Sequence, residues 1–242
     1  MLSQEYVMFT VVIIAIVWGA FAIAYWYENT QYKKSSYGKQ SNKSFWKTIN
    51  NQGARGEYRT SQILETATFE NRLLFNCYIP NRSGEKTELD IIMISTKGIY
   101  VVENKNYSGW IFGDEQSKNW CETLKGKKFF FYNPVKQNKS HIRNLEKVLN
   151  IGEDKYISLI TFNKNAILKK VKTESPKLYV KKYDELKKFI KEQEKCPDIL
   201  QHEEIEEIYK NLLPGTQLND KEKQEHIERI KKQYKKNCGI QR

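Results

Sequence analysis

The chain has 242 residues, of which 39% are hydrophobic and 13% aromatic, and its formal net charge is +12. This composition supplies enough apolar surface for a packed core and so excludes a wholly disordered chain. The basic charge favours a polyanionic partner, either nucleic acid or an anionic membrane surface, and charge alone does not choose between them. The four cysteines lie far apart without a CxxC pair, which argues against a zinc site or a disulfide framework and is typical of a reducing compartment.

Residues 6–27, YVMFTVVIIAIVWGAFAIAYWY, form an apolar segment without a charged residue. Their length matches the roughly 20 apolar residues that a helix needs to cross a bilayer. Tyr25, Trp26 and Tyr27 end the segment as an interfacial aromatic belt would. The alternatives are a buried core helix and a cleaved signal peptide, which would begin with basic residues and carry a shorter apolar stretch. We therefore expect a transmembrane helix over residues 6–27.

The residues that flank this segment predict its orientation. Only Glu5 is charged before it, whereas five lysines follow it: Lys33, Lys34, Lys39, Lys43 and Lys47. Because positively charged flanks stay on the cytoplasmic side, we expect a single-pass protein of the cell membrane with its N-terminus outside and the rest in the cytoplasm. The same lysines can also lie against anionic lipid headgroups. Residues 28–50 are polar and are interpreted as a juxtamembrane linker.

From residue 51 onward the pattern predicts helices and strands. Apolar spacing indicates a helix at about 54–68 and an amphipathic helix over 135–149. The runs 88–95 and 98–107 are joined at Thr96-Lys97-Gly98, which is typical of a β-hairpin. Other short apolar runs predict further strands, at 73–80, 109–113, 127–133, 156–162 and 177–181.

The tail, residues 183–242, has a different character. Its segments DELKKFIKEQ, EEIEEIYKNLL and KEKQEHIERIKKQYKK are charged and helical in pattern, with sparse apolar positions. They either pack as a small helical appendage or serve as an interaction tail for a protein partner.

The hairpin carries the candidate site. If Thr96 and Lys97 form a two-residue turn, Ser95 pairs with Gly98 and the register then places Asp90 opposite Glu103. Cross-strand partners point to the same face of a sheet, and Lys105, two residues after Glu103, shares that face. A shift of one residue in register would break this alignment.

Two adjacent carboxylates repel each other, so they require a divalent cation or at least one raised pKa. Carboxylate oxygens are the ligands that Mg²⁺ prefers, and a neighbouring lysine can stabilise negative charge on a phosphate or orient an attacking water. Together these groups suit metal-assisted hydrolysis of a phosphodiester. The bare pattern of Asp90, Glu103 and Lys105 is common in lysine-rich chains, and surface ends of strands are its alternative explanation.

Four stretches in a fixed order resemble the nuclease-related domain, a branch of the PD-(D/E)xK nuclease superfamily. They are GARGEYRTSQIL, ELDIIMISTKGIYVVENKNYSGWIFG, Trp120 and NPVKQNKSHIRNL, and the resemblance covers about residues 50–165. It implies an α/β, restriction-endonuclease-like core over residues 51–182, with a central mixed β-sheet flanked by helices. It also implies a nuclease that depends on Mg²⁺ or Mn²⁺ and acts on nucleic acid, with DNA favoured over RNA.

The resemblance assigns roles to residues of this chain. It makes Asp90 and Glu103 metal ligands and Lys105 the motif lysine. Glu57 matches an acidic residue that often completes the metal site, although the helix dipole alone favours a glutamate in a first turn. Gln137 matches a helical glutamine beside the site, and an ordinary exposed helix residue is its alternative.

Three neighbouring features are less specific. His141 follows Gln137 by one helical turn and so faces the same way; it is either a phosphate or proton-transfer group or a structural hydrogen-bonding group. Asn133 is expected to cap the following helix. Superfamily members often have proline before the aspartate, where this chain has Leu89.

Four lysines flank the aromatic run 129–132: Lys127, Lys128, Lys136 and Lys139. Basic residues beside aromatic ones can bind a nucleic-acid strand by charge and stacking, so these lysines are candidate nucleic-acid contacts. A strand that buries alternate aromatic side chains in a core explains the same pattern, and for the aromatic residues we favour that interpretation.

The sequence thus supports three hypotheses. The first is a membrane-anchored, metal-dependent nuclease with Asp90, Glu103, Lys105 and Gln137 in its catalytic site. The second is a domain of nuclease fold that binds nucleic acid or another phosphate ligand without cutting it. The third is a membrane-tethered interaction protein whose C-terminal helices recruit a partner.

Overall fold

The structure is a computed structural model that describes residues 4–217 and residue 228. Its centre is a five-stranded mixed sheet in the order β1-β2-β3-β7-β9. The first three strands are antiparallel neighbours, whereas β7 is parallel to β3 and β9 is parallel to β7. The strands are β1 (Asn71–Pro80), β2 (Lys86–Ser95), β3 (Gly98–Lys105), β7 (Tyr156–Phe162) and β9 (Leu178–Lys182).

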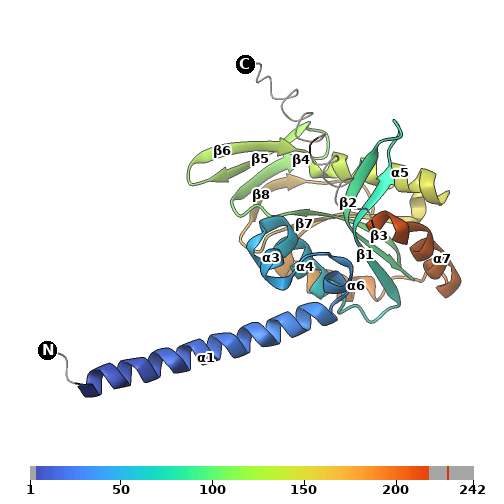
Figure 1. Cartoon of the computed structure of the whole chain (residues 1–242). Coiled ribbons are helices and arrows are strands. Elements are labelled where there is room, and N and C mark those ends of the chain that lie inside the picture. The colour runs from blue at the N-terminus through green and yellow to red at the C-terminus, as the bar shows by residue number, and fades with distance from the viewer. Residues whose placement is uncertain (1–3, 218–227, 229–242) are drawn as a thin grey trace.

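A second, four-stranded sheet in the order β6-β5-β4-β8 lies beside the first (Figure 1). Its strands are β4 (Trp110–Asp114), β5 (Asn119–Leu124), β6 (Lys127–Tyr132) and β8 (Ile167–Lys172). Its inner face packs on the central sheet through the buried side chains of Ile111 and Trp120, whose ring stacks on Phe162 with 6.1 Å between ring centroids. The sequence patterns missed β5 and β8, because both mix polar and apolar residues in short segments.

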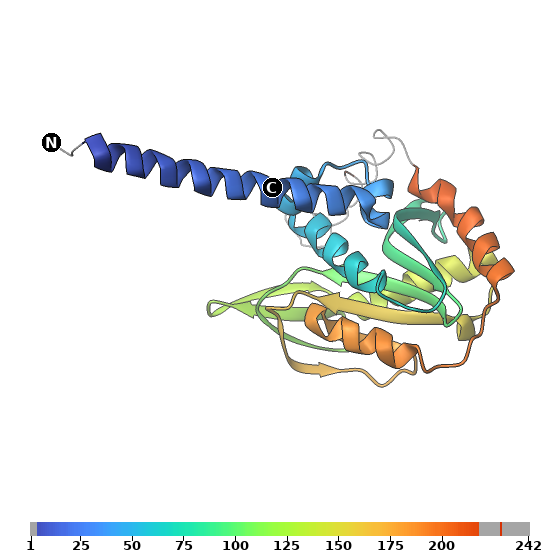
Figure 2. The ribbon, with the colours of Figure 1, turned by 90° about the horizontal axis from the view of Figure 1, so that it is seen from below.

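Helices cover both faces of the central sheet (Figures 1 and 2). Because successive side chains of a strand point to opposite faces, Phe75 and Ile91 pack against one helical layer and Leu74 and Ile92 against the other. The first layer contains α2 (Ser36–Gln40), α3 (Phe45–Asn50), α4 (Gln52–Leu64) and α6 (Leu186–Gln193). The second layer contains α5 (Pro134–Leu149) and α7 (His202–Leu212). Short 3₁₀ segments lie at Glu153–Lys155, Tyr183–Glu185 and Leu213–Thr216.

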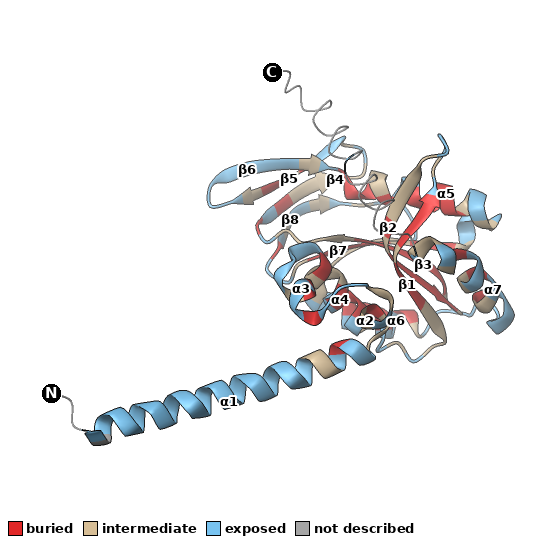
Figure 3. Cartoon of the chain, in the orientation of Figure 1, coloured by how far each residue is buried: buried red, intermediate tan, exposed pale blue. Residues whose placement is uncertain are grey.

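The helix α1 (Gln4–Lys34) projects from this body, and all but its last turns are exposed (Figure 3). The helix over Tyr6–Lys34 is long and apolar enough to cross a membrane, because it contains an 18-residue stretch with a mean hydropathy of 2.6 and no buried residue. A signal sequence near the N-terminus passes the same test of length and composition. The helix is therefore a candidate membrane span.

The segment 28–50 differs from the polar linker that we expected. It continues α1 and forms α2 and α3, and Tyr32, Tyr37 and Phe45 are core residues. The Tyr32 hydroxyl lies within hydrogen-bond distance of Ser41, the Lys43 carbonyl and Thr48. Although most residues of this segment are polar, its aromatic side chains cover one face of the sheet. The segment is therefore part of the domain.

The predicted tail, residues 183–242, consists of a part that packs on the domain and a part that lies mostly outside the described residues. Residues 183–216 pack their apolar side chains against the chain's own sheet, with Leu186 and Phe189 on one face and Ile205 and Ile208 on the other. The helix predicted for KEKQEHIERIKKQYKK lies outside the described residues, apart from residue 228. Of the cysteines, Cys77, Cys121 and Cys196 are free within the described part of the chain.

Candidate active site

The β2–β3 hairpin has the register that the sequence predicted. Ser95 pairs with Gly98 and the ladder continues to Ile91 opposite Val102. One further step along both strands places Asp90 opposite Glu103, so their side chains share one face of the sheet. Lys105 adds a third charged group to this face.

Glu103 is the buried centre of the site, with 2% of its surface exposed. Its Oε1 lies 2.7 Å from Lys105 Nζ, and its Oε2 lies 3.5 Å from His141 Nε2. Burial alone would raise the pKa of Glu103, but Lys105 and His141 hold that pKa below its ordinary value. Glu103 is therefore a carboxylate at neutral pH.

Asp90 is half-buried, and its Oδ2 accepts a hydrogen bond of 2.8 Å from the backbone N–H of Asn104. Burial, followed by the charges of Glu103 and Glu57, raises the pKa of Asp90 well above its ordinary value. Like charges in a poorly solvated place favour the protonated form of one partner. The pKa of Asp90 is thus raised and that of Glu103 lowered, although both carboxyl groups lie near Lys105.

The helix α4 brings Glu57 to the same place. A Cβ on Gly56 would lie 2.8 Å from the Oδ1 of Asn104 on β3, so glycine at this position lets the helix approach the strand closely. Glu57 Oε2 accepts hydrogen bonds from the Tyr37 hydroxyl at 3.0 Å and from Asn76 Nδ2 at 3.1 Å. These bonds aim its carboxylate along the edge of the site.

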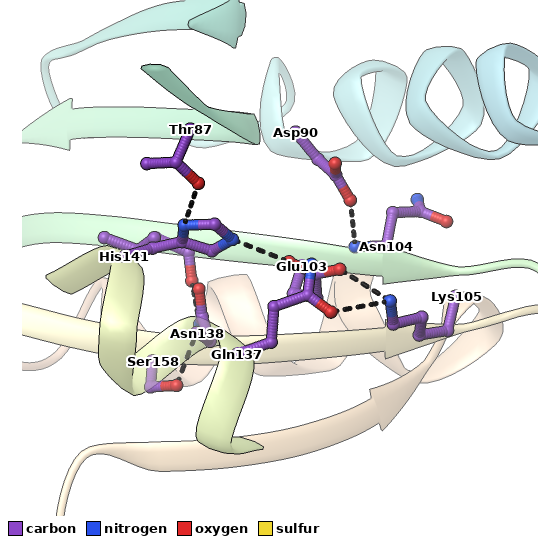
Figure 4. A network of polar contacts seen from close by, with 10 residues as sticks. Thr87, Asp90, Glu103, Asn104, Lys105, Gln137, Asn138, His141 and Ser158 are labelled. Atoms are coloured by element: carbon purple, nitrogen blue, oxygen red, sulfur yellow. Dashed lines mark hydrogen bonds and ion pairs between the residues drawn. The ribbon is translucent and has the colours of Figure 1, made fainter. Parts of the chain in front are cut away.

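The helix α5 supplies the opposite wall (Figure 4). Asn133 caps it by accepting a hydrogen bond from the backbone N–H of Val135, as predicted. Asn138 is buried and fastens the helix to the sheet by donating to the Val101 carbonyl and to Ser158, each at 2.8 Å. Gln137 and His141 then face the hairpin.

Both of these side chains reach the charged groups of the hairpin. Gln137 Oε1 accepts a hydrogen bond of 3.1 Å from Lys105 Nζ. The His141 ring lies between Glu103 and Thr87, whose hydroxyl is 3.5 Å from Nδ1. Burial alone would lower the pKa of Lys105, but Glu103 and Asp90 raise it above its ordinary value. The lysine therefore stays protonated.

A cleft of about 510 Å³ opens onto these groups. Glu57, Asp90, Glu103, Lys105, Gln137 and His141 line it. The structure thus brings together every acidic, lysine and glutamine side chain that the sequence placed in the catalytic site.

Comparison with known proteins now identifies the family. The family model of the nuclease-related domain matches residues 52–163, a span that contains all six of the named cleft residues. An uncharacterized protein of Bacillus anthracis is 31% identical over 165 residues, which cover 68% of this chain and 76% of the relative. The chain belongs to the nuclease-related domain family. The crystal structure of a protein of unknown function, AF1548, matches half of each chain at 15% identity with a TM-score of 0.31.

The donor groups of this nuclease-related domain suit a hard divalent cation in part. Asp90 and Glu103 offer carboxylate oxygens, which such ions prefer, and a cation would relieve the repulsion that raises the pKa of Asp90. However, no group of three or more His, Cys, Asp or Glu residues is arranged as metal ligands within residues 4–217. Glu57 lines the same cleft as Asp90 and Glu103, and its role as a third metal ligand stays a prediction.

The predicted nucleic-acid contacts separate into two pairs. Lys136 and Lys139 lie on α5 and line a second hollow, which meets the cleft at Tyr132 and Ser140. Lys127 and Lys128 lie at the far end of β6, beyond the cleft. The two pairs therefore belong to different surfaces of the nuclease-related domain.

The aromatic run 129–132 corrects a prediction. We favoured a strand that buries alternate aromatic side chains. Phe131 does pack against the core, but Phe129, two residues before it, is 49% exposed, and Phe130 and Tyr132 are 65% and 51% exposed. β6 is the edge strand of the second sheet, and no other described residues cover the rings of Phe129, Phe130 and Tyr132 enough to bury them.

Two residues around Glu57 escaped the sequence prediction. Tyr37 lies in the segment interpreted as a linker, where no pattern marked it. Asn76 did carry a signal, because it is the one polar residue in the apolar run LLFNCYI. It has a left-handed φ of 49°, a conformation that asparagine adopts more readily than most residues, and this turns its amide toward Glu57.

Proposed function

We propose that this protein is a membrane-anchored, metal-dependent nuclease that hydrolyses phosphodiester bonds of DNA, with RNA as the alternative substrate. One observation carries the proposal. The fold gathers a buried carboxylate, Glu103, a second carboxyl group, Asp90, and a protonated lysine, Lys105, in one open cleft of a nuclease-related domain. The positive charge of the chain supports a polyanionic substrate.

Asp90 and Glu103 are the residues that would hold Mg²⁺ or Mn²⁺. When bound, such an ion polarises a phosphate oxygen and lowers the pKa of a coordinated water. Asp90 would give up its proton on binding, because the cation replaces the repulsion from Glu103 and Glu57 with attraction. Glu57 stays beside the pair and adds negative charge to it.

Lys105 would stabilise the substrate. Its raised pKa keeps it protonated, so it serves as a fixed positive charge for the scissile phosphate and for the negative charge that develops during attack. Gln137 accepts a hydrogen bond from its ammonium group, which also contacts Glu103. His141 contacts Glu103 and so orients that carboxylate. Lys136 and Lys139 border the cleft and would bind backbone phosphates of the substrate.

The test uses the full chain in detergent with DNA and RNA substrates, in Mg²⁺, in Mn²⁺ and in EDTA. We expect cleavage that EDTA stops and that Asp90→Asn, Glu103→Gln and Lys105→Met each reduce at least a hundredfold, since charge stabilisation is usually the largest catalytic effect. The matched control is Glu122→Gln. Glu122 is also a buried glutamate, but it accepts hydrogen bonds from the backbone of Ser108 and Gly109 outside the cleft.

Equal cleavage by the native protein and by Glu103→Gln would contradict the proposal. A loss of cleavage in the control as large as in Glu103→Gln would point to damage of the fold instead. Circular dichroism of each variant separates these cases.

A second candidate function is nucleic-acid binding without cleavage. The observation that favours it is that each carboxyl group already has a partner within the protein. Glu103 is paired with Lys105, and Asp90 accepts a hydrogen bond from the backbone N–H of Asn104. Glu57 accepts hydrogen bonds from Tyr37 and Asn76. Salt-sensitive binding that survives Glu103→Gln, with no turnover in any metal, would support this candidate. Metal-dependent turnover would exclude it.

The membrane anchor is part of the proposal. α1 would cross the bilayer over residues 6–27, with the N-terminus outside and the nuclease-related domain in the cytoplasm. Protease treatment of intact cells and of inverted vesicles tests this topology. Digestion of the domain only in inverted vesicles is expected, and release of a soluble, shortened chain into the medium would show a cleaved signal sequence instead.

A further inference from the structure

The β5–β6 hairpin ends in an exposed apolar and basic tip, which we define as residues 124–130. Leu124, Phe129 and Phe130 are 37%, 49% and 65% exposed. Lys125 and Gly126 form the turn with left-handed φ angles of 50° and 77°, the pairing that a tight hairpin turn requires. Three exposed lysines accompany the apolar side chains: Lys125, Lys127 and Lys128.

The fold itself does not explain these exposed rings. The inner face of the second sheet is covered where Trp120 and Phe131 pack, at the base of the hairpin. Toward the tip both strands run past that cluster, and the described residues leave Phe129 and Phe130 49% and 65% exposed. Exposed apolar side chains that gather at one place mark a contact surface, and lysines around aromatic rings are typical of contact with a lipid interface.

The direction of the hairpin points to the membrane. In both Figure 1 and Figure 2 the tip projects to the side toward which the N-terminal part of α1 extends. The aromatic end of the candidate span is fixed to the domain, because Tyr25 packs against Phe45 and Trp46 at centroid distances of 5.6 and 6.4 Å. Trp46 is itself 60% exposed. A bilayer that surrounds residues 6–27 therefore begins beside the domain, on the side that the hairpin tip faces.

We propose that the hairpin tip is a second membrane contact, which places Phe129 and Phe130 among the headgroups of an anionic bilayer while its lysines bind lipid phosphates. The proposal rests on α1 crossing a bilayer, and it is independent of the nuclease chemistry. The occupant is phospholipid because the tip combines apolar rings with positive charge, which suits the boundary between acyl chains and anionic headgroups.

Nucleic acid is the competing partner of the same lysines. The cleft meets β6 at Tyr132, whereas the tip begins at the other end of this six-residue strand, about 17 Å away at the rise of a β-strand. A surface that faces a bilayer is also closed to a long polyanion. The geometry thus assigns Lys127 and Lys128 to lipid, and it leaves Lys136 and Lys139 for the substrate.

The experiment places the photoreactive amino acid p-benzoylphenylalanine in turn at positions 130, 148 and 21 of the full chain. The protein is reconstituted in nanodiscs of phosphatidylcholine mixed equally with phosphatidylglycerol, and in nanodiscs of phosphatidylcholine alone. Val148 is the matched control, because it is also an exposed apolar residue at 40% but lies at the end of α5. Phe21 in α1 reports whether the helix is in the bilayer.

We expect lipid adducts at positions 21 and 130, with the yield at 130 several-fold above that at 148 and higher in the anionic nanodiscs. Combined Lys125→Gln, Lys127→Gln and Lys128→Gln substitutions should remove the preference for anionic lipid. Equal yields at 130 and 148, with an adduct at 21, would overturn the proposal. So would the absence of an adduct at 21, since the anchor would then be missing.

A further arm adds a single-stranded oligonucleotide to the same nanodiscs. Adducts of position 130 with the oligonucleotide instead of lipid would assign the tip to nucleic acid and overturn the membrane contact. The Glu103→Gln variant should give the same lipid adducts as the native chain, which separates a failure of this proposal from a failure of the nuclease proposal.

Discussion

The ammonium group of Lys105 lies 2.7 Å from Oε1 of Glu103, a carboxylate that is almost fully buried. Both residues come from the end of β3 and are two positions apart, so the strand itself aligns them. The pair neutralises a charge inside the domain and at the same time presents a positive group to the cleft. Structure and proposed chemistry therefore depend on the same contact.

Removal of the lysine should destabilise the fold. Lys105→Met leaves the Glu103 carboxylate buried without its counterion, and loss of one partner of such a pair costs about 3 kcal/mol of unfolding free energy. Chemical unfolding in detergent, followed by circular dichroism, measures the difference. The double variant with Glu103→Gln should regain most of the loss, and equal destabilisation in the single and double variants would contradict the role of this pair.

Asp90 should make stability depend on pH. Its pKa is raised in the folded state above the ordinary value of 3.8, so the folded protein binds this proton more tightly than the unfolded chain does. The stabilisation is fully present below pH 3.8 and is lost as pH rises through the raised pKa. Glu103 has the opposite shift, and its contribution is lost only below its ordinary value of 4.5.

Unfolding should therefore become easier as pH rises above 4.5, and Asp90→Asn should flatten that part of the profile. Thermal unfolding of both proteins across this range, without added metal, provides the measurement. Parallel profiles would show that Asp90 has no raised pKa.

Gln137 should position Lys105 for catalysis. Gln137→Leu removes the acceptor at 3.1 Å, and loss of such an orienting contact lowers activity about tenfold or more. The turnover number should fall while the Michaelis constant stays nearly unchanged. Lys147→Ala, on the same helix, should leave turnover unchanged. A larger effect on substrate affinity than on turnover would instead make Gln137 a binding residue.

Packing beneath the second sheet should tolerate no added volume at Gly113. A Cβ there would lie 2.4 Å from the indole ring of the buried Trp120, so Gly113→Ala is expected to cost about 2 kcal/mol or more of unfolding free energy. The control is Gly53→Ala, where a Cβ meets only ordinary contacts with the N-cap residue Asn51 and with Glu57. It should be neutral or stabilising by up to about 1 kcal/mol. Equal melting temperatures would show that the ring moves aside.

Residues 28–50 should be required for folding. A chain that begins at residue 28 keeps Tyr32, Tyr37 and Phe45 in the core and is expected to be folded. A chain that begins at residue 51 exposes the face that these rings cover, and it should aggregate or lose its cooperative melting transition. Cooperative unfolding of the shorter chain at the same temperature would contradict this.

Much of the central sheet was readable from the sequence, because its strands are continuous apolar runs that differ from the charged residues around them. The expected neighbourhood of Asp90 and Glu103 depended on a two-residue turn at Thr96-Lys97, which the sequence alone did not fix and which the structure has. The exposure of Phe130 was not readable. The sequence pattern of an aromatic residue on a strand is the same whether or not another layer of the fold covers that residue.

The partners of the site were also harder to predict than its centre. Asp90, Glu103 and Lys105 come from one hairpin, so local register was sufficient. Glu57 receives its hydrogen bonds from Tyr37 and Asn76 on two other elements, and such contacts depend on how helices dock against the sheet. Periodicity gives the face of a helix but not its depth or rotation against a neighbour.

The burial of Tyr32 joins the last turns of α1 to the core of the domain. If α1 crosses a bilayer, as proposed, this packing ties the orientation of the domain to that of the helix. In a bilayer the cleft would keep a constant height and tilt, whereas a flexible tether would let it sample a hemisphere. The protein would then encounter ligands by lateral diffusion in the membrane. The distance between the bilayer and the cleft would decide which ligands it can reach.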